Sequence, residues 1–260
     1  MPGDASTGTF LQGLERGLAV IRAFSTEAPS LTLSEVARAV GITPATARRI
    51  LLTLEELGYV RSDNRRFSLT PRVLALGWAY LSSLDLGELA GPFMEELSAK
   101  TRESCSIATL DLPDIVYVAR VPTSRIMTVA LGVGARLPAY PTSMGRVLLA
   151  ALPDEDLTAY LETVQAEPLT DRTLTAPDAL RASITQARAD GYALVDQELE
   201  LGLRSIAAPI HNSRGRVIAA LNVSAHASRS TATSLCEEFL PHLQQAATQI
   251  TTALTHRGNF

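Results

Sequence analysis

The chain has 260 residues, 46% of them hydrophobic and 19% charged, which is enough for two domains with buried cores and excludes a broadly disordered protein. No apolar run approaches the ~18 residues of a membrane span, and residues 1–9 lack the pattern of a secretory signal. The two cysteines, Cys105 and Cys236, lie far apart in the sequence, which excludes a disulfide scaffold and a Cys-based zinc site. We therefore expect a cytoplasmic protein with no membrane partner.

Charge is distributed unevenly along the chain. The net charge is −4, but residues 1–80 contain 9 basic and 7 acidic side chains, whereas residues 81–260 contain 14 and 20. A mildly basic N-terminal part on an acidic body is typical of a small nucleic-acid-binding domain joined to a second domain. Because 22 of the 23 basic residues are arginine, a single arginine is weaker evidence of a phosphate contact than usual.

Residues 10–70 have the pattern of a small helical domain with two short strands, and we expect residues 1–9 to form a disordered arm. Thr32 and Glu35 form a capping box, and Thr43-Pro44 supplies the N-cap and first-turn proline of the next helix. These signals and the apolar spacing predict helices over 10–24, 32–41 and 43–57, then strands over 59–61 and 67–69.

The second and third helices fit a helix-turn-helix. This motif needs a small residue where the helices cross and a residue that accepts a positive φ in the turn, and Ala37 and Gly41 meet these needs. The two strands would form a wing. An ordinary helical bundle would not explain the short, polar, arginine-bearing face at the start of the helix predicted over 43–57. This face predicts contacts with double-stranded DNA through Thr43, Ala45, Thr46, Arg48 and Arg49 on the helix and Arg65 and Arg66 on the wing.

The remaining sequence mixes helices and strands, which indicates an α+β sensor-like domain. A helix over 71–84 is apolar on all sides, so burial of Trp78 in a dimer interface is favoured over a cofactor site. A helix over 85–102 follows, which Gly91-Pro92 should kink. The pattern then predicts strands over 104–110, 115–121, 126–131, 192–196, 203–211 and 216–224, and helices over 142–151, 153–162, 177–190 and 230–254.

Motifs for catalysis are incomplete. The segment from Gly132 begins like a dinucleotide loop, but Leu137 stands where the third glycine belongs, so a turn is predicted. The histidines do not fall at metal-ligand spacing, and we predict neither a metal nor a cofactor. Ser143 could be a hydrolase nucleophile, but Pro141 replaces the first glycine of a nucleophile elbow, so anion binding at a helix N-terminus is favoured. The acidic run 196–200 is expected to be a solvated loop.

Three stretches resemble the IclR family of bacterial transcription regulators, and the resemblance extends from Leu11 to Leu254. They include LERGLAVI at 14–21 with SEVARAVGI at 34–42, GARLPAYPTSMGRVLLA at 134–150, and SIAAPIHN at 205–212. The resemblance implies a winged helix-turn-helix, a linker helix and a C-terminal GAF-like effector-binding domain. It also implies a homodimer or a dimer of dimers on a pseudo-palindromic operator. Segments 117–123 and 137–146 resemble the PcaR and PobR group, which governs the catabolism of protocatechuate and related aromatic acids.

The resemblance also implies the position of an effector pocket. In the family pattern Val195 is usually Asp or Ser, so this chain is expected to contact a small carboxylic acid effector more apolarly. Alternation along the predicted strands could point Ser205 and Asn222 inward, where either a small organic anion or backbone groups would satisfy them. The implied lining is Leu137, Ser143, Met144, Val195, Ser205, Asn222 and Ser224.

The sequence therefore predicts a ligand-responsive DNA-binding regulator without catalytic activity. We expect a winged helix-turn-helix at 10–70, a linker or dimerisation helix at 71–84 and an effector-binding domain at 85–257. Two alternatives stay open: a serine-dependent hydrolase that uses Ser143, and a regulator whose effector pocket is vestigial.

Overall fold

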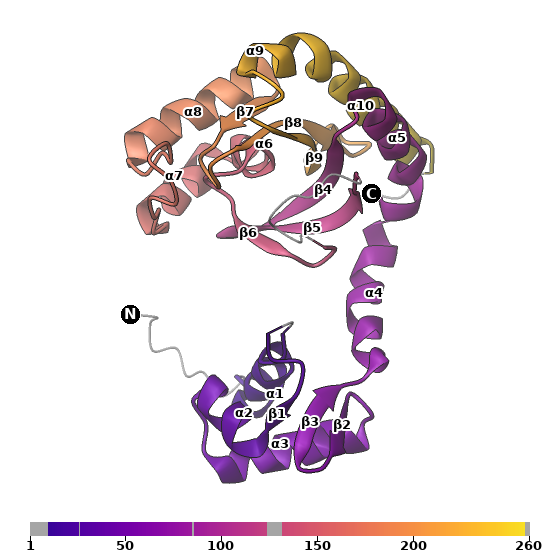
Figure 1. Ribbon diagram of the computed structural model, residues 1–260, viewed down its shortest axis with the longest axis vertical. Helices are drawn as coiled ribbons and strands as arrows, with labels where there is room; N and C mark the ends of the chain where they lie inside the picture. The colour runs from indigo at the N-terminus through magenta and orange to yellow at the C-terminus, as the bar shows by residue number, and fades with distance from the viewer. Residues whose placement is uncertain (1–9, 26, 85, 124–131, 258–260) are drawn as a thin grey trace. The chain divides into compact units, whose positions relative to one another are not determined.

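The computed structural model describes residues 10–25, 27–84, 86–123 and 132–257, and these divide into two compact units, Met1–Ser83 and Leu84–Phe260 (Figure 1). The arm predicted at 1–9 and the strand predicted at 126–131 lie outside the described residues. In the described part, none of the helices is long and apolar enough to cross a membrane.

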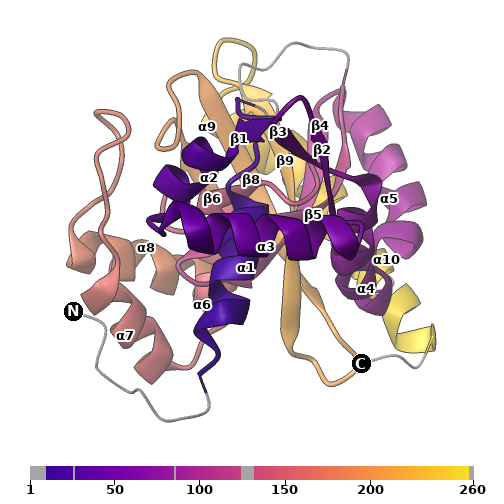
Figure 2. The ribbon, with the colours of Figure 1, turned by 90° about the horizontal axis from the view of Figure 1, so that it is seen from below.

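The first unit contains three helices and a small antiparallel sheet. The helices are α1 (Gln12–Arg22), α2 (Leu33–Val40) and α3 (Pro44–Glu56), and α3 crosses α1 in Figure 2. The sheet has the order β1-β3-β2, with β1 (Leu31–Thr32), β2 (Val60–Asp63) and β3 (Arg66–Leu69). Side chains from all three helices and β2 form its core: Val20, Val36, Ala37, Ala47, Leu51, Leu54 and Val60.

Local signals set the helix boundaries of this unit. The N–H of Thr32 donates to the Glu35 carboxylate at 2.7 Å, and the Thr32 hydroxyl accepts from the Glu35 N–H, so the capping box is confirmed. Thr43 caps α3, and Gly41 adopts a φ of +69° in the turn between α2 and α3. Strand β1 was not predicted, because two residues are too few to show a period.

The predicted helix at 71–84 is divided into a 3₁₀ turn (Pro71–Val73) and α4 (Leu74–Leu84). Thr70 caps the turn through the Arg72 N–H. Several large apolar side chains of α4 are exposed within this chain, including Leu74 at 74% and Trp78 at 61%.

The second unit is built on a six-stranded antiparallel sheet with the order β6-β5-β4-β9-β8-β7. Its strands are β4 (Ser104–Asp111), β5 (Asp114–Val121), β6 (Arg136–Pro138), β7 (Ala193–Asp196), β8 (Leu203–His211) and β9 (Val217–His226). Helices α5 (Leu86–Thr101) and α10 (Leu240–Arg257) cover one face. Helix α6 (Ser143–Ala150) packs on the other, with α8 (Pro177–Asp190) and α7 (Asp154–Thr163) outside it (Figure 1).

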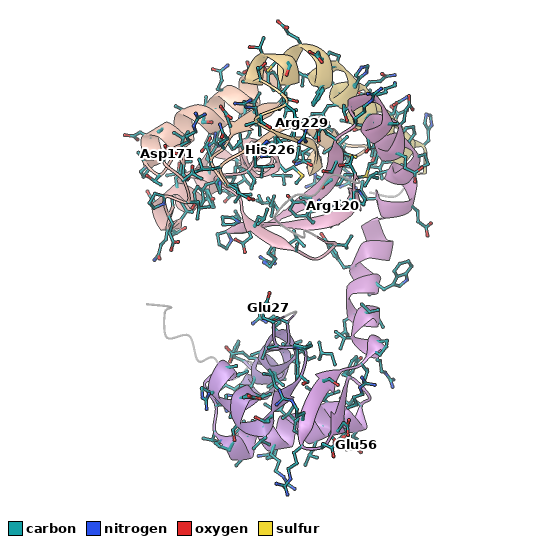
Figure 3. All side chains as sticks on the ribbon, viewed as in Figure 1. Glu27, Glu56, Arg120, Asp171, His226 and Arg229 are labelled. Carbon is teal, nitrogen blue, oxygen red and sulfur yellow. The ribbon has the colours of Figure 1, made fainter. Side chains whose placement is uncertain are left out.

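Helix α6 is the centre of this unit, since all eight of its residues are buried between the sheet and α8. Gly145 is required there: a Cβ atom at this position would lie 2.0 Å from the carbonyl oxygen of Ala139. The turn after β9 is held by an ion pair, in which Arg229, labelled in Figure 3, lies 3.1 Å from the Glu103 carboxylate.

Two predicted elements of secondary structure in this unit need correction. The segment from Gly132 is not only a turn, because Arg136–Pro138 forms the edge strand β6, which pairs Leu137 with Ile115. The predicted final helix consists of α9 (Ala232–Ser234), a π-helical turn (Leu235–Phe239) and α10. A three-residue edge strand is too short to show alternation, and apolar spacing does not separate a single π turn from an α turn.

Candidate functional site

The exposed start of α3 carries the residues predicted to contact DNA. Thr43, Ala45, Arg48 and Arg49 are exposed, whereas Thr46 is half-buried. Thr43 accepts a hydrogen bond from the Thr46 N–H at 3.2 Å, and the two hydroxyl oxygens lie 2.9 Å apart. The first turn is therefore ordered by its own cap, and its outer face presents two arginines.

The arginines of this face differ in how they are held. Arg48, Arg49 and Arg65 make no ion pair or side-chain hydrogen bond with any residue that the structure describes. Arg66, in contrast, donates from Nε to the Ser30 hydroxyl at 3.0 Å and lies 3.7 Å from the Glu35 carboxylate. Arg66 therefore ties the wing to the start of α2, while the other three cations are available to a polyanion.

The wing turn has an unusual backbone. Asp63 pairs with Arg66, so Asn64 and Arg65 are the two central residues of a tight hairpin turn. Both have positive φ angles, +49° and +66°. This is the backbone of a type I′ turn, which favours asparagine first and glycine second. An arginine at the second position is strained, and strain of this kind concentrates at functional positions.

The second unit contains a small cavity of about 30 Å³ between the start of α6 and strands β7, β8 and β9. Six of the seven residues implied by the family resemblance line it: Ser143, Met144, Val195, Ser205, Asn222 and Ser224. Leu137 does not line this cavity and packs instead against the core beside α6. Sequence reasoning missed five lining residues, namely Tyr117, Pro141, Thr142, Leu199 and Leu203.

Strand register explains why distant residues meet in the cavity. Val195 on β7 pairs with Ser205 on β8, and Ser205 pairs with Ser224 on β9. Asn222 lies two positions from Ser224 on the same face of β9, so it joins this row. Its amide donates to the Ser224 hydroxyl at 3.0 Å and its oxygen accepts from the Ser106 N–H at 3.0 Å, so Asn222 is fixed in orientation.

The start of α6 forms the polar end of the cavity. The Thr142 hydroxyl accepts from the Gly145 N–H at 3.0 Å, so this N–H serves the helix cap. The Ser143 hydroxyl is buried and has no hydrogen-bond partner among the described residues. A buried polar group without a partner is costly, and a ligand oxygen would satisfy it. Tyr117 also lines the cavity, and burial raises the pKa of its hydroxyl to about 12, so it stays a neutral phenol.

The acidic run 196–200 is not a solvated loop, contrary to the prediction. Glu198 is buried and its carboxylate lies 2.5 Å from Nη2 of the buried Arg146 on α6. Asp196 accepts from Arg204 at 2.7 Å and from Arg172 at 3.0 Å. The hydrogen bond from Arg204 is the main cause that lowers the pKa of Asp196. The partner arginines are distant in the sequence, so the run alone could not reveal them.

The cavity offers nothing to activate a nucleophile. Its described lining includes no His, Asp, Glu or Lys, so Ser143 has no general base beside it. Within the described ranges, no group of His, Cys, Asp and Glu side chains could hold a metal ion. The geometry therefore gives no support to the serine-hydrolase alternative.

Comparison with known proteins agrees with the fold and with the helix-turn-helix. The chain matches the IclR helix-turn-helix domain over residues 13–64 and the bacterial transcriptional regulator IclR C-terminal domain over residues 78–252. It is 49% identical over 239 residues to the Pca regulon regulatory protein of Pseudomonas putida, covering 92% of this chain and 82% of that protein.

Two solved structures have the same fold. A putative transcriptional regulator from Rhodococcus sp. RHA1 is 56% identical with a TM-score of 0.83, covering 94% of this chain and 98% of that one. An IclR homologue from Microbacterium hydrocarbonoxydans, solved in complex with 4-hydroxybenzoate, is 27% identical with a TM-score of 0.83, covering 93% and 98%. The fold, the helix-turn-helix and these matches together place the chain in the IclR family of bacterial transcriptional regulators.

Proposed function

We propose that this regulator binds a small aromatic carboxylic acid in the cavity beside α6, and that this binding controls its action on DNA. The observation that carries the proposal is the buried Ser143 hydroxyl, which lacks a partner at the N-terminus of α6. The N–H groups and dipole of a helix N-terminus favour an anion, so the ligand's carboxylate is placed beside Ser143.

The chemistry of the cavity favours an aromatic acid over a small keto acid. Val195, Leu199 and Leu203 form an apolar wall, and Met144 adds to it from α6. The hydroxyls of Tyr117 and Ser205 supply neutral hydrogen-bonding groups near that wall, which suits a ring with a hydroxyl substituent. One relative was solved in complex with 4-hydroxybenzoate and another is named for the Pca regulon, which supports 4-hydroxybenzoate or protocatechuate, with the aliphatic dicarboxylate β-ketoadipate as the alternative outside the aromatic class.

A thermal-shift screen tests this proposal. A ligand present at a hundred times its dissociation constant adds ~2.7 kcal/mol to the free energy of unfolding. We expect stabilisation by protocatechuate or 4-hydroxybenzoate, and loss of that effect in Ser143→Leu, which fills the anion position. Stabilisation by β-ketoadipate alone would keep the acid-binding site but contradict the aromatic class. Stabilisation by pyruvate or glyoxylate alone would refute the aromatic class. No response to any acid would favour a vestigial pocket, and a burst with activated esters that Ser143→Ala abolishes would favour a hydrolase.

We further propose that α3 and the wing bind the DNA. The support is the contrast between Arg48, Arg49 and Arg65, which have no partner among the described residues, and Arg66, which is held by Ser30. Arg49, with Thr46, is assigned to the bases or adjacent phosphates, and Arg48 and Arg65 are assigned to phosphates. Gel-shift titrations with an operator fragment and with random DNA test these assignments. Loss of the phosphate contact of Arg65 should weaken the binding of operator and of random DNA equally.

We propose that two copies of the chain pair through the first unit. Helix α4 carries several exposed large apolar side chains, among them Leu74, Leu76 and Trp78. Large apolar side chains exposed together on one helix favour an interface, and a two-fold pair would place two α3 helices on a pseudo-palindromic site. Sedimentation analysis tests the pairing: Trp78→Glu should yield monomers that lose operator binding, and a monomeric wild-type protein would contradict it.

A further inference from the structure

The buried ion pair between Arg146 and Glu198 joins the two walls of the effector cavity. Ser143, which carries the polar end of the cavity, lies three positions before Arg146 on α6, so the two share one turn of the helix. Leu199, which belongs to the apolar wall, follows Glu198 directly. The Arg146 Nη2 and Glu198 Oε2 atoms lie 2.5 Å apart, so the ion pair ties the two walls together next to Ser143 and Leu199.

Each partner of this pair also holds a second segment. Nε of Arg146 donates to the carbonyl oxygen of Tyr140 at 3.1 Å, which fixes the turn before α6, where Pro141 lines the cavity. The Glu198 carboxylate accepts from the Leu174 N–H at 3.1 Å. Both charges are thus satisfied by a neighbouring backbone group as well as by one another, which a buried pair requires if it is to be held in one geometry.

The segment 170–174 forms a second attachment for the connection between β7 and β8. The hydroxyl of Thr173 donates to the Glu198 carbonyl oxygen at 2.6 Å, and the hydroxyl of Thr170 donates to the Gln197 carbonyl oxygen at 2.7 Å. Asp171, labelled in Figure 3, marks this segment. Gln197 has a φ of +62°, so the chain turns sharply where it is anchored. Leu199 and Leu203 follow this anchored turn into the cavity.

The cavity is too small to hold an aromatic acid without a change in the position of its walls. About 30 Å³ is room for roughly two water molecules, whereas sites for small organic ligands enclose roughly 300–1,000 Å³. Binding of an aromatic acid therefore requires one wall to move. Helix α6 is buried on all sides, so it is the less mobile wall. The wall that carries Leu199 and Leu203 is the one that can move, and the Glu198 carboxylate limits how far.

We propose that the Arg146–Glu198 pair is a clamp that sets the size limit of the effector cavity and so determines which aromatic acids the protein accepts. This inference rests on the proposed aromatic-acid function. Neither side chain lines the cavity, so both are positioning residues that act through Leu199 and Ser143. With the clamp intact, the wall that carries Leu199 and Leu203 can move far enough to admit a single-ring acid, whereas a two-ring acid must break the buried ion pair. When the ion pair is broken, the difference in affinity between a single-ring and a two-ring acid becomes smaller.

Titration calorimetry on the full-length protein with two probes tests the clamp. The probes are 4-hydroxybenzoate and 6-hydroxy-2-naphthoate, and the variant is Glu198→Gln, which removes the charge but keeps the shape. We expect the preference of the wild-type protein for the smaller acid to fall by about tenfold or more in the variant, on the scale by which apolar pockets discriminate size. Asp154→Asn is the matched control, because it breaks an exposed ion pair with Arg188 away from the cavity.

The ratio of the two affinities distinguishes a clamp from a merely structural role. A general loosening of the second unit would weaken the binding of both probes by the same factor and leave the ratio unchanged. If Glu198→Gln fails to fold, Thr173→Val is the second variant, because it removes the hydrogen bond to the Glu198 carbonyl oxygen and leaves the ion pair in place. It should shift the affinity ratio in the same direction by a smaller factor. An unchanged ratio in a folded variant, with the wild type binding 4-hydroxybenzoate, would overturn the clamp and leave the proposed function intact. A wild type that binds neither acid would overturn both.

Discussion

Replacing Arg65 with glycine should stabilise the DNA-binding unit and weaken its binding to DNA at the same time. Arg65 occupies the second central position of the wing turn with a φ of +66°. A left-handed backbone costs a non-glycine residue about 1–2 kcal/mol, whereas glycine adopts it freely. Glycine loses more conformational entropy on folding, so we expect a net gain in the free energy of unfolding of roughly 0.5–1 kcal/mol.

The effect on DNA binding has the opposite sign because the variant loses its charge. Each phosphate contact contributes about 0.9 to the slope of log K against log salt concentration. If two wings contact one operator, Arg65→Gly should flatten this slope by about 1.8. The stability gain corresponds to a rise of roughly 2–8 °C in the unfolding temperature of a unit of this size.

Calorimetry and salt-dependent gel shifts measure the two effects separately. Arg65→Ala removes the same charge but keeps the strained backbone, so it should change the salt slope equally without raising the unfolding temperature. Arg214→Ala is a control for charge alone, since this exposed arginine lies in the turn between β8 and β9 of the other unit. Equal unfolding temperatures for the glycine and alanine variants would refute the argument from strain, and a wild-type salt slope in both would refute the phosphate contact.

Three further substitutions test other parts of the structure. Arg49→Ala should reduce the preference for operator over random DNA by ~1–3 kcal/mol if the contact is bidentate to guanine, which competition gel shifts measure. Gly145→Ala places a Cβ atom 2.0 Å from the Ala139 carbonyl oxygen, and should lower the free energy of unfolding by about 1–3 kcal/mol or more in urea titrations. Burial raises the pKa of the Cys105 thiol to about 12, so it stays protonated in the folded protein while the unfolded thiol ionises near 9.0. The free energy of unfolding should therefore fall as the pH rises from 9 toward 12, and urea titrations at pH 8 and 10 should show a smaller fall in Cys105→Ala.

Elements whose signals are local could be predicted from the sequence. The capping box of Thr32 and Glu35, the N-cap at Thr43 and the glycine turn at Gly41 each involve residues within a few positions of one another. Their geometry depends little on the rest of the fold. Six cavity residues also came from the sequence, but through the family resemblance rather than from periodicity, because alternation along a strand does not show which strands become neighbours.

Features that depend on distant contacts could not be predicted. Glu198 and Arg146 are 52 positions apart, and only the folded chain shows that this carboxylate is buried against a guanidinium. Tyr117 lies on β5 and enters the cavity only because the sheet places β4, β9 and β8 beside it in that order. Leu199 lies in a connection without regular structure, where no period exists to indicate burial.

The role of each arginine depends on whether the fold places a carboxylate beside it. In the described part of the second unit, the arginines that form ion pairs include Arg136, Arg146, Arg172, Arg188, Arg204 and Arg229. On the face formed by α3 and the wing, Arg48, Arg49 and Arg65 have no such partner in the described structure. The described lining of the cavity contains no arginine at all, so we expect hydroxyl and N–H groups to hold the proposed acid there. Screening by salt weakens exposed charges far more than buried dipoles, so operator affinity should fall steeply with salt while the dissociation constant for 4-hydroxybenzoate changes little.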